Sequence, residues 1–390
     1  MEIKEIQNYL EKHKLDGWLL TDYNGRNNIA LSMLSISGMV TRRSFYLMPS
    51  AGEPVALVHA IEKDRFEHLP AKIITYIGYK QMEEKLRDIL QDYKTIAMEY
   101  SPLGHLPDFG LVDAGMIELV KSFGLEVVSS ADMVARFEAR LSPEQIATHR
   151  VAANNLIEIK GNAFDYIKKS ITDNHSVTEY DVSQYILEQF EKYDMETSSA
   201  PICAVNSHAG NPHYEPKSEK SAVIKKGQLV LIDLWAKIKH PHGVYADITW
   251  MGFVGTKEEI PSKLTDLFTV IVKARDTAVD YLHKHIDSQV VLGSEVDDIC
   301  RQVIVEAGFG DHFTHRTGHS ITSIVHGNGP NIDNLETEDN RKLQKGHLFS
   351  VEPGLYFDDF GFRTEIDVLI GHNGVEVTTL PLQMEIKPLF

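Results

Sequence analysis

Apolar residues recur at two different spacings in the first part of the chain. Residues 5–15 place them three or four positions apart, as on one face of a helix. Short runs rich in β-forming side chains, which indicate strands, occupy residues 16–22, 44–49, 54–59, 95–100 and 124–130. Because helical patterns separate several of these strands, this part of the chain is predicted to be an α/β domain with a parallel or mixed sheet.

A second unit begins at a strong helix start. Ser142 can accept a hydrogen bond from the amide of Gln145, whose side chain can reach back, and Pro143 fits the first helical position. Helical patterns cover residues 143–169, a segment starting near 178, 264–285 and 294–307, and strand patterns cover 200–205, 228–238, 245–254, 347–357 and 363–371. Long helices beside runs of strands predict an α+β unit whose helices cover one face of an antiparallel sheet. We therefore expect two domains, 1–140 and 141–390.

The composition disfavours several classes of protein. A chain of 390 residues is too long for a single small module, and its formal charge of −17 disfavours nucleic acid and anionic membranes as partners. Cys203 and Cys300 form no CxxC pair, so neither a disulfide framework nor a sulfur-ligated metal site is predicted. The sequence has no apolar run near the roughly 18 residues of a membrane span and no signal-peptide pattern at its start. We expect a soluble, cytoplasmic protein.

Acidic residues interrupt the apolar strands of the second unit. They are Asp233, Asp247, Glu352 and Glu365, each flanked by β-forming residues. A single carboxylate in a strand usually lies on the solvated face or pairs with arginine, and this alternative applies to each of them alone. Together in one interior, they would have to be protonated or bind cations, because burial and mutual repulsion both oppose their charge.

Turn patterns bring these carboxylates together in pairs. Residues 237–243 have turn character and separate Asp233 from Asp247, so the two aspartates are expected across a β-hairpin from each other. Residues 358–361 separate the two glutamates in the same way. Two hairpins would each present a pair of carboxylates.

A dense group of histidines offers nitrogen ligands. Four of the 18 histidines lie in the segment HFTHRTGHSITSIVHGNGP, namely His312, His315, His319 and His326. A solvated loop is one interpretation, but histidine is also the commonest metal ligand and a proton shuttle. A glycine, which permits close approach of the backbone, precedes His319 and favours it as the ligand.

A family resemblance rests on five residues in a fixed order: Asp233, Asp247, His319, Glu352 and Glu365. With their flanks PHYEP, LIDLW, YADIT, HRTGH, VHG, VEPGLY and RTE, they resemble the metal-binding signature of the pita-bread metallopeptidases, which include methionine aminopeptidase, aminopeptidase P and prolidase. The amino-terminal half loosely resembles the creatinase-like domain of the last two. The resemblance implies an α/β creatinase-like domain and an α+β pita-bread catalytic domain, in the proline-specific branch.

The resemblance also implies that these residues bind two divalent metal ions. Asp247 and Glu365 would bridge the ions. Asp233 would bind one ion, and His319 with Glu352 would bind the other. The carboxylates would balance the charge of two dications, and one nitrogen among oxygen ligands suits Mn²⁺, which we expect, or Co²⁺, Fe²⁺ or Zn²⁺. A hydroxide bridging the metals would then attack the peptide bond.

Further histidines acquire roles by the same resemblance. His213, in NPHYEP, matches a histidine that contacts the peptide near the scissile bond. His326 matches one that stabilises the tetrahedral oxyanion. His315 matches the first histidine of the prolidase-type HxxGH, which implies a supporting or proton-transfer role. Glu352 is expected to carry protons in addition to binding metal.

Two polar residues are candidates for supporting the ligands. Arg363 lies two residues before Glu365, hence on the same strand face, and would orient that carboxylate. Its alternative is an exposed surface arginine. Thr249 lies two residues after Asp247 and is a candidate for the same kind of contact.

The sequence departs from the family pattern in three places. Residues 237–243 lengthen the spacing of the two aspartates by a turn insertion, which leaves the ligands in place and alters the rim of the cleft. Ser320-Ile321-Thr322 replaces the glycine-rich run after the ligand histidine, and VHG replaces VHE. We expect these changes to bear on the shape of the substrate pocket and not on the metal site.

We therefore expect a metal-dependent Xaa-Pro aminopeptidase that acts on proline-containing peptides and forms a homodimer, as its relatives commonly do. A prolidase restricted to Xaa-Pro dipeptides is the nearest alternative, because chain length and motifs do not separate the two. A non-catalytic binding protein with the same fold is less favoured, because such proteins usually lose ligands and carry charged tails.

Overall fold

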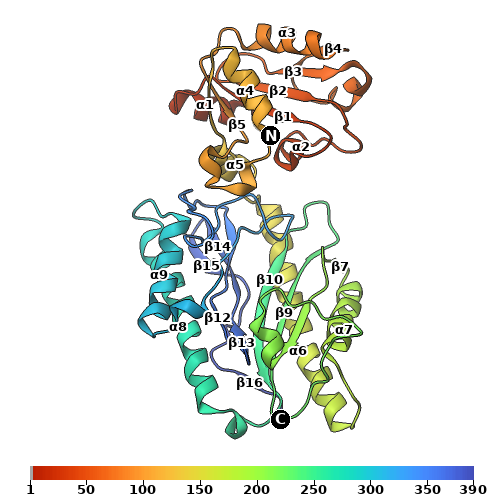
Figure 1. Ribbon diagram of the computed structural model, residues 1–390, viewed down its shortest axis with the longest axis vertical. Coiled ribbons are helices and arrows are strands. Elements are labelled where there is room, and N and C mark those ends of the chain that lie inside the picture. Colours follow the sequence, from red (N-terminus) through yellow and green to blue (C-terminus); the bar gives the residue numbers. More distant parts are fainter. Residues whose placement is uncertain (1–2) are drawn as a thin grey trace. The chain divides into compact units, whose positions relative to one another are not determined.

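The computed structural model describes residues 3–390, and the chain divides after Glu138 into two compact units (Figure 1). The carboxy-terminal unit extends from Ala139 to Phe390. Each unit has its own hydrophobic clusters. Within residues 3–390, no helix combines the length and the apolar content needed to cross a membrane.

A mixed sheet organises the described part of the amino-terminal unit. In the order β4-β3-β2-β1-β5-β6, its strands are Lys72–Tyr76, Val55–His59, Ser44–Pro49, Gly17–Asp22, Thr95–Met98 and Glu126–Ser129. β2 pairs antiparallel with both neighbours, and the other pairs are parallel. The α/β prediction for this unit is therefore confirmed, although β4 was not predicted.

Helices cover both faces of this sheet. They are α1 (Ile3–Lys12), α2 (Asn28–Met33), α3 (Tyr79–Leu90), α4 (Ala114–Ser122) and α5 (Ala131–Phe137). Successive residues of a strand point to opposite faces, so Trp18 and Leu20 of β1 pack with α1, α2 and α5, whereas Leu19 packs with α3 and α4.

Capping boxes start the first two helices of the carboxy-terminal unit. Gln145 N donates to Ser142 Oγ at 3.2 Å, and Ser142 N donates to the Gln145 side chain at 2.9 Å. Thr178 and Asp181 form the same arrangement, so both predicted helix starts are confirmed. The helices of this unit are α6 (Pro143–Thr172), α7 (Glu179–Lys192), α8 (Ser262–His285) and α9 (Gly293–Glu306).

The strands of this unit form several sheets. The largest has the order β16 (Lys387–Pro388), β10 (Ala246–Phe253), β9 (Leu229–Ile238) and β7 (Met195–Glu196). β8 (Ile202–Val205) also pairs with β9. A second sheet contains β11 (Leu348–Val351), β14 (Ile366–Gly371) and β15 (Gly374–Val377), and a two-stranded hairpin contains β12 (Gly354–Tyr356) and β13 (Gly361–Arg363).

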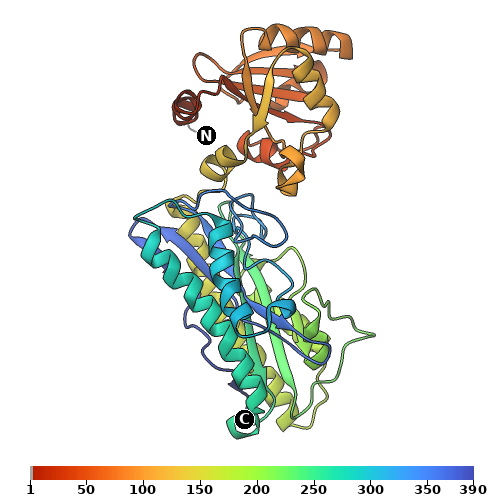
Figure 2. The same ribbon diagram turned by 60° about the vertical axis from the view of Figure 1, so that its left-hand side comes forward.

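Helices lie on both sides of these strands, with α6 and α7 on one side and α8 and α9 on the other (Figures 1 and 2). The alternation of β9 explains the layering: Val230 and Ile232 pack with α6 and α7, while Leu229 and Leu231 pack with α8, α9 and the second sheet. The sheet of β9 and β10 therefore carries helices α6 and α7 on one face, as predicted, whereas the second sheet, which α8 contacts at β15, was not predicted as a separate layer. The face of β9 that carries Leu231 points toward the second sheet, so side chains on this face lie between the two layers.

Two strands predicted as continuous are interrupted where they carry acidic residues. β11 ends at Val351 before Glu352 and Pro353, and Glu365 falls between β13 and β14. Proline has no N–H to continue a ladder. The backbone N–H of Glu352 instead donates to Thr317 O at 2.7 Å, and that of Glu365 donates to Thr249 O at 3.2 Å. The breaks hold both glutamates between the sheets.

Candidate metal centre

A cavity of about 550 Å³ lies in the carboxy-terminal unit. Its lining includes the sequence-predicted residues His213, Asp233, Asp247, His315, His319, His326, Glu352, Arg363 and Glu365. Of the predicted site residues, Thr249 alone is absent from this lining, and its side chain is fully buried behind the wall. The structure therefore brings the predicted residues to one place, from segments far apart in the sequence.

β9 and β10 present the two aspartates on the same face. Their antiparallel register pairs Asp233 with Thr249 and Trp235 with Asp247, and directly opposed residues point to the same side of a sheet. The two carboxylates are therefore diagonal neighbours across the β9–β10 hairpin that the turn at 237–243 predicted.

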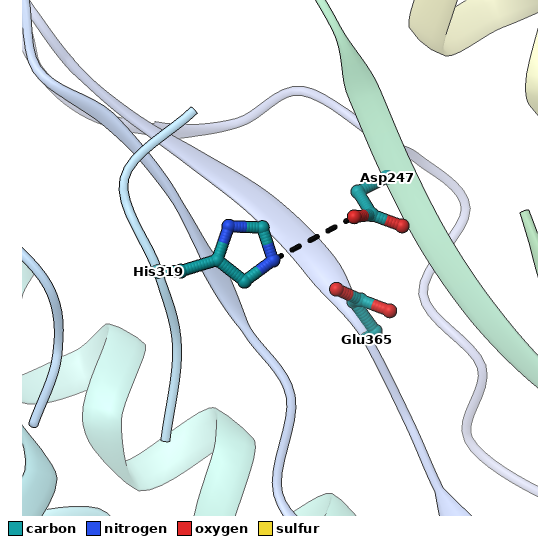
Figure 3. A group of neighbouring side chains, drawn as sticks. All are labelled: Asp247, His319 and Glu365. Atoms are coloured by element: carbon teal, nitrogen blue, oxygen red, sulfur yellow. Dashed lines mark ion pairs between the residues drawn. The ribbon is translucent and has the colours of Figure 1, made fainter. Parts of the chain in front are cut away.

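Asp247, His319 and Glu365 converge on one point (Figure 3). Each offers one ligand atom, and these atoms lie within 4.8 Å of one another. His319 Nε2 is 3.6 Å from Asp247 Oδ2 and 3.6 Å from Glu352 Oε1. These separations exceed a hydrogen bond and match donors that share a cation.

Hydrogen bonds set the orientation of the imidazole of His319. Its Nδ1 lies 3.3 Å from Ser320 O, and its backbone N–H donates to Ser350 Oγ at 3.0 Å. A ring that donates from Nδ1 leaves Nε2 unprotonated, so the lone pair of Nε2 can bind a cation together with the carboxylates. Ser350 Oγ also donates to Glu352 Oε1 at 3.1 Å, so one hydroxyl holds both residues.

The carboxylates of the cluster destabilise one another's charge. Burial raises the pKa of Asp247 and of Glu365 well above their ordinary values, and nearby carboxylates raise both further. Burial also raises the pKa of Glu352 to about 7, although Arg363 opposes the shift. The pKa of Asp233 is raised by burial against the effect of Arg363.

Two buried carboxylate oxygens of the cluster lack partners. Oδ1 of Asp233 and Oδ1 of Asp247 have no hydrogen-bond partner within residues 3–390. Buried polar atoms are normally satisfied, so such an atom needs an explanation. A set of carboxylates with one imidazole suits a hard or borderline divalent cation, which would satisfy these atoms and neutralise their charge. The residues present therefore fit the metal site that the sequence implies.

The contacts of Arg363 differ from those that the sequence predicted. It is only 4% exposed, so the alternative of a surface arginine is wrong. Its guanidinium donates to Asp233 Oδ2, to Thr249 Oγ1 at 3.1 Å and to Tyr356 OH at 3.0 Å. Thr249 Oγ1 in turn donates to Glu365 Oε2 at 2.7 Å. The strand ends at Arg363, so Arg363 and Glu365 do not lie on one continuous strand face. The guanidinium contacts Asp233 directly, and its contact with Glu365 runs through the hydroxyl of Thr249.

Tyr356 is a site residue that the sequence argument missed. Its hydroxyl accepts from Arg363 and lies 2.6 Å from His315 Nε2. Since the guanidinium can only donate, the hydroxyl donates to Nε2, and His315 Nδ1 then donates to Arg316 O at 2.7 Å. Burial lowers the pKa of His315 to about 3, which agrees with a neutral ring. Tyr356 stands in VEPGLY, which was noted only for its glutamate.

The remaining predicted histidines line the cavity in different settings. The ring of His326 lies edge-on to that of His319, with 4.3 Å between their centroids. His213 reaches the cavity from an exposed loop after β8. Arg316 also lines the cavity, and its guanidinium makes no hydrogen bond or ion pair among residues 3–390, a feature that the sequence argument did not consider.

Comparisons with known proteins identify the family of this chain. A model of metallopeptidase family M24 matches residues 152–372. Over 386 residues the chain is 26% identical to an uncharacterized peptidase of Staphylococcus epidermidis, with 97% of this chain and 98% of the relative covered.

Two solved structures share the fold along nearly the whole chain. Dipeptidase PepE from Mycobacterium ulcerans matches with a TM-score of 0.76 and 19% identity, covering 99% of this chain and 96% of that one. The prolidase from Pyrococcus horikoshii matches with a TM-score of 0.67 and 22% identity, covering 98% and 99%. At these identities the likeness concerns the fold.

Proposed function

The chain belongs to metallopeptidase family M24, and on that basis we propose that it is an exopeptidase that removes the amino-terminal residue from Xaa-Pro peptides. Membership makes it a metal-dependent peptidase, and the position of the cleaved bond is the proposal. The observation that carries it is the convergence of Asp247, His319 and Glu365 on one point of a cavity large enough for a short peptide. The intact donor set also counts against a non-catalytic binding protein.

We assign the metal ligands of the proposed enzyme as follows. Asp247 and Glu365 would be shared by two divalent ions, Asp233 would hold one ion, and His319 with Glu352 would hold the other. Mn²⁺ is the expected metal, with Co²⁺, Fe²⁺ or Zn²⁺ as alternatives. When bound, such ions polarise the scissile carbonyl and lower the pKa of water at the site. The unpartnered oxygens of Asp233 and Asp247 support this assignment.

Other residues of the cavity would handle the substrate and its protons. Glu352 lines the cavity beside His319 and would also take up and release a proton during the reaction. His326, next to His319, would donate a hydrogen bond to the carbonyl oxygen as it gains charge. His213 would contact the peptide near the leaving nitrogen, and His315 would act through Tyr356 on Arg363.

The apolar part of the cavity supports the preference for proline. Ile202, Pro212, Trp235 and Val325 line it beside the acidic cluster. A proline ring after the scissile bond has no N–H to satisfy and buries apolar surface against such a wall.

Arg316 favours a second candidate function, an Xaa-Pro dipeptidase. Arg316 lines the cavity, its guanidinium makes no hydrogen bond or ion pair among the described residues, and arginine binds carboxylates through paired hydrogen bonds. In a dipeptide the free carboxylate follows the proline directly, so such a cation would select the shortest substrates.

A panel of short peptides tests both proposals. The enzyme is stripped with a chelator, reloaded with individual metals and given Xaa-Pro, Xaa-Pro amide and Xaa-Pro-Yaa-Yaa. An aminopeptidase cleaves the longer peptide and the amide, whereas a dipeptidase cleaves Xaa-Pro alone and loses roughly tenfold or more in kcat/KM for it in Arg316→Ala. Arg150→Ala, which removes an exposed arginine on α6, is the matched control. Absence of cleavage with every metal would refute the proposed function.

A further inference from the structure

The loop that carries His213 is fastened at both of its ends by one buried side chain. We name residues 206–221 the anchor loop; it connects the end of β8 to the segment beside the start of α7. Its middle, Asn211 to His213, lines the cavity, whereas residues 217–220 are exposed. The anchor loop contains the short turn Asn206–Gly210 and otherwise no helix or strand of its own, so contacts with the rest of the unit must define its position.

Glu179, the first residue of α7, makes those contacts and is 0% exposed. Val205 N donates to its Oε1 at 2.7 Å, immediately before the anchor loop, and Ala222 N donates to its Oε2 at 2.8 Å, immediately after it. Within the loop, Tyr214 OH donates to Oε2 at 2.6 Å and His208 Nδ1 lies 2.9 Å from both oxygens. A carboxylate only accepts, so the histidine is the donor here.

These donors satisfy the carboxylate and link the two ends of the loop to its interior. The rings of His208 and Tyr214 stack with 4.5 Å between their centroids, which joins the residues on either side of His213. The backbone of Glu179 adds a hydrogen bond to Ala222 O at 3.1 Å. Hydrogen bonds to a buried charged group are among the stronger ones in proteins.

The other side of the loop packs on the hairpin that follows Glu352. A Cβ at Gly361 would clash with the carbonyl oxygen of Ala209, and a Cβ at Gly210 would clash with that of Phe357. The two backbones therefore touch directly, and neither position accepts a side chain. The anchor loop is held between Glu179 and the β12–β13 hairpin, with His213 projecting at the cavity.

We propose that Glu179 is a positioning residue that holds His213 at the substrate cavity by fastening the anchor loop at both ends. Glu179 itself does not line the cavity, so its effect on turnover passes through the loop. The catalytic part of this inference rests on the proposed function, whereas the fastening of the loop does not.

Trypsin tests the fastening without any assay of turnover. Lys217 and Lys220 are exposed within the anchor loop. In Glu179→Gln, one carboxylate oxygen becomes an NH₂ group, which cannot accept a hydrogen bond from a backbone N–H and so weakens the fastening. Because proteolysis follows the population of the open loop, cleavage after these lysines should be roughly tenfold faster or more. Cleavage elsewhere should keep its rate, as should every site in Glu188→Gln, which changes an exposed glutamate of the same helix. Unchanged cleavage at both lysines would overturn the proposal.

Turnover tests whether Glu179 acts through His213. Glu179→Gln should lower kcat/KM about as much as His213→Ala, with metal content unchanged, and the double variant should be no slower than His213→Ala alone. Losses that multiply in the double variant would mean that Glu179 acts on the fold and not on His213. If Glu179→Gln does not fold, Tyr214→Phe removes one donor and should shift both readouts in the same direction. A wild-type protein inactive on all peptides would refute the proposed function, and the trypsin result alone would then decide the fastening.

Discussion

The Nε2 atom of His319 and the Oδ2 atom of Asp247 lie 3.6 Å apart, beyond a hydrogen bond and close enough to share a cation (Figure 3). Without a cation, the same cluster concentrates buried carboxylates whose pKa values are raised by burial and by one another. The geometry of the site therefore suits a bound cation. Without a cation, the carboxylates repel one another.

This repulsion gives Glu365→Gln opposite effects on the two states. The variant should lose activity and divalent metal, measured by elemental analysis, because a shared ligand has gone. Without metal it should unfold at a higher temperature than the wild type without metal, because a neutral amide replaces a carboxyl group whose ionisation the site opposes. Mn²⁺ at a hundred times its Kd should stabilise only the wild type, by about 2.7 kcal/mol.

Glu338→Gln, which changes an exposed glutamate, is the control and should behave as the wild type in both states. Full metal content in Glu365→Gln would contradict the assignment of Glu365 as a ligand.

His326→Ala should slow turnover with the metal still bound. A residue that stabilises the developing oxyanion typically contributes a factor of roughly 10² to 10³ in kcat, and the ring of His326 lies beside a ligand without belonging to the converging group. Steady-state kinetics with elemental analysis of the same sample provides the measurement. Loss of metal in this variant would instead make His326 a ligand.

Arg363→Lys should weaken metal binding even though it keeps the positive charge. A lysine cannot reach Asp233, Thr249 and Tyr356 at once, as the guanidinium does. Loss of such outer contacts typically lowers metal affinity by roughly 10- to 100-fold, which calorimetric titration of the metal-free protein measures. Tyr356→Phe keeps the bond to Asp233 and is the matched comparison, with a smaller expected loss. Equal affinity in Arg363→Lys and wild type would show that Asp233 needs no such support.

His149 should make the carboxy-terminal unit sensitive to acid. Its Nδ1 lies 2.7 Å from Tyr245 O and its Nε2 lies 2.7 Å from Thr378 Oγ1, and burial lowers its pKa from 6.5 to about 4. The folded state therefore keeps the ring neutral while the unfolded state takes up a proton below pH 6.5. The associated stability is fully present above pH 6.5 and is lost as the pH falls toward 4, by about 3 kcal/mol in total.

Denaturant unfolding at several pH values measures this loss. His149→Gln should show a shallower decline of unfolding free energy between pH 6.5 and 4, whereas His283→Gln, at an exposed position of α8, should retain the wild-type slope. A wild-type slope in His149→Gln would remove His149 as the cause.

Features with local signals were predictable from the sequence. The capping residues Ser142 and Thr178 identified their helices because a cap and its partner are only three positions apart. The turn at 237–243 identified the hairpin that aligns Asp233 and Asp247. The family resemblance is confirmed by the match over residues 152–372. The assignment of individual residues to metal and substrate stays a prediction.

Features that depend on distant partners were not predictable. Arg363 was paired with its sequence neighbour Glu365 because a continuous strand was assumed, whereas its guanidinium donates to Asp233 of β9. Tyr356 has no pattern of its own, since its role arises from two residues that meet only in the fold. β4 was missed because this edge strand is mostly half-buried and lacks a clear apolar alternation.

Successive residues of β9 point to opposite faces of the sheet, so inserting or deleting an odd number of residues within this strand would move Asp233 to the other face. Removing one residue from 229–232 would turn Asp233 into the hydrocarbon layer beneath α6 and present an aliphatic side chain to the cavity in its place. Gains or losses of any length between residues 239 and 243 leave both aspartates where they are. Among related sequences, insertions and deletions should therefore be found in the hairpin turn at 239–243 and be rare in β9.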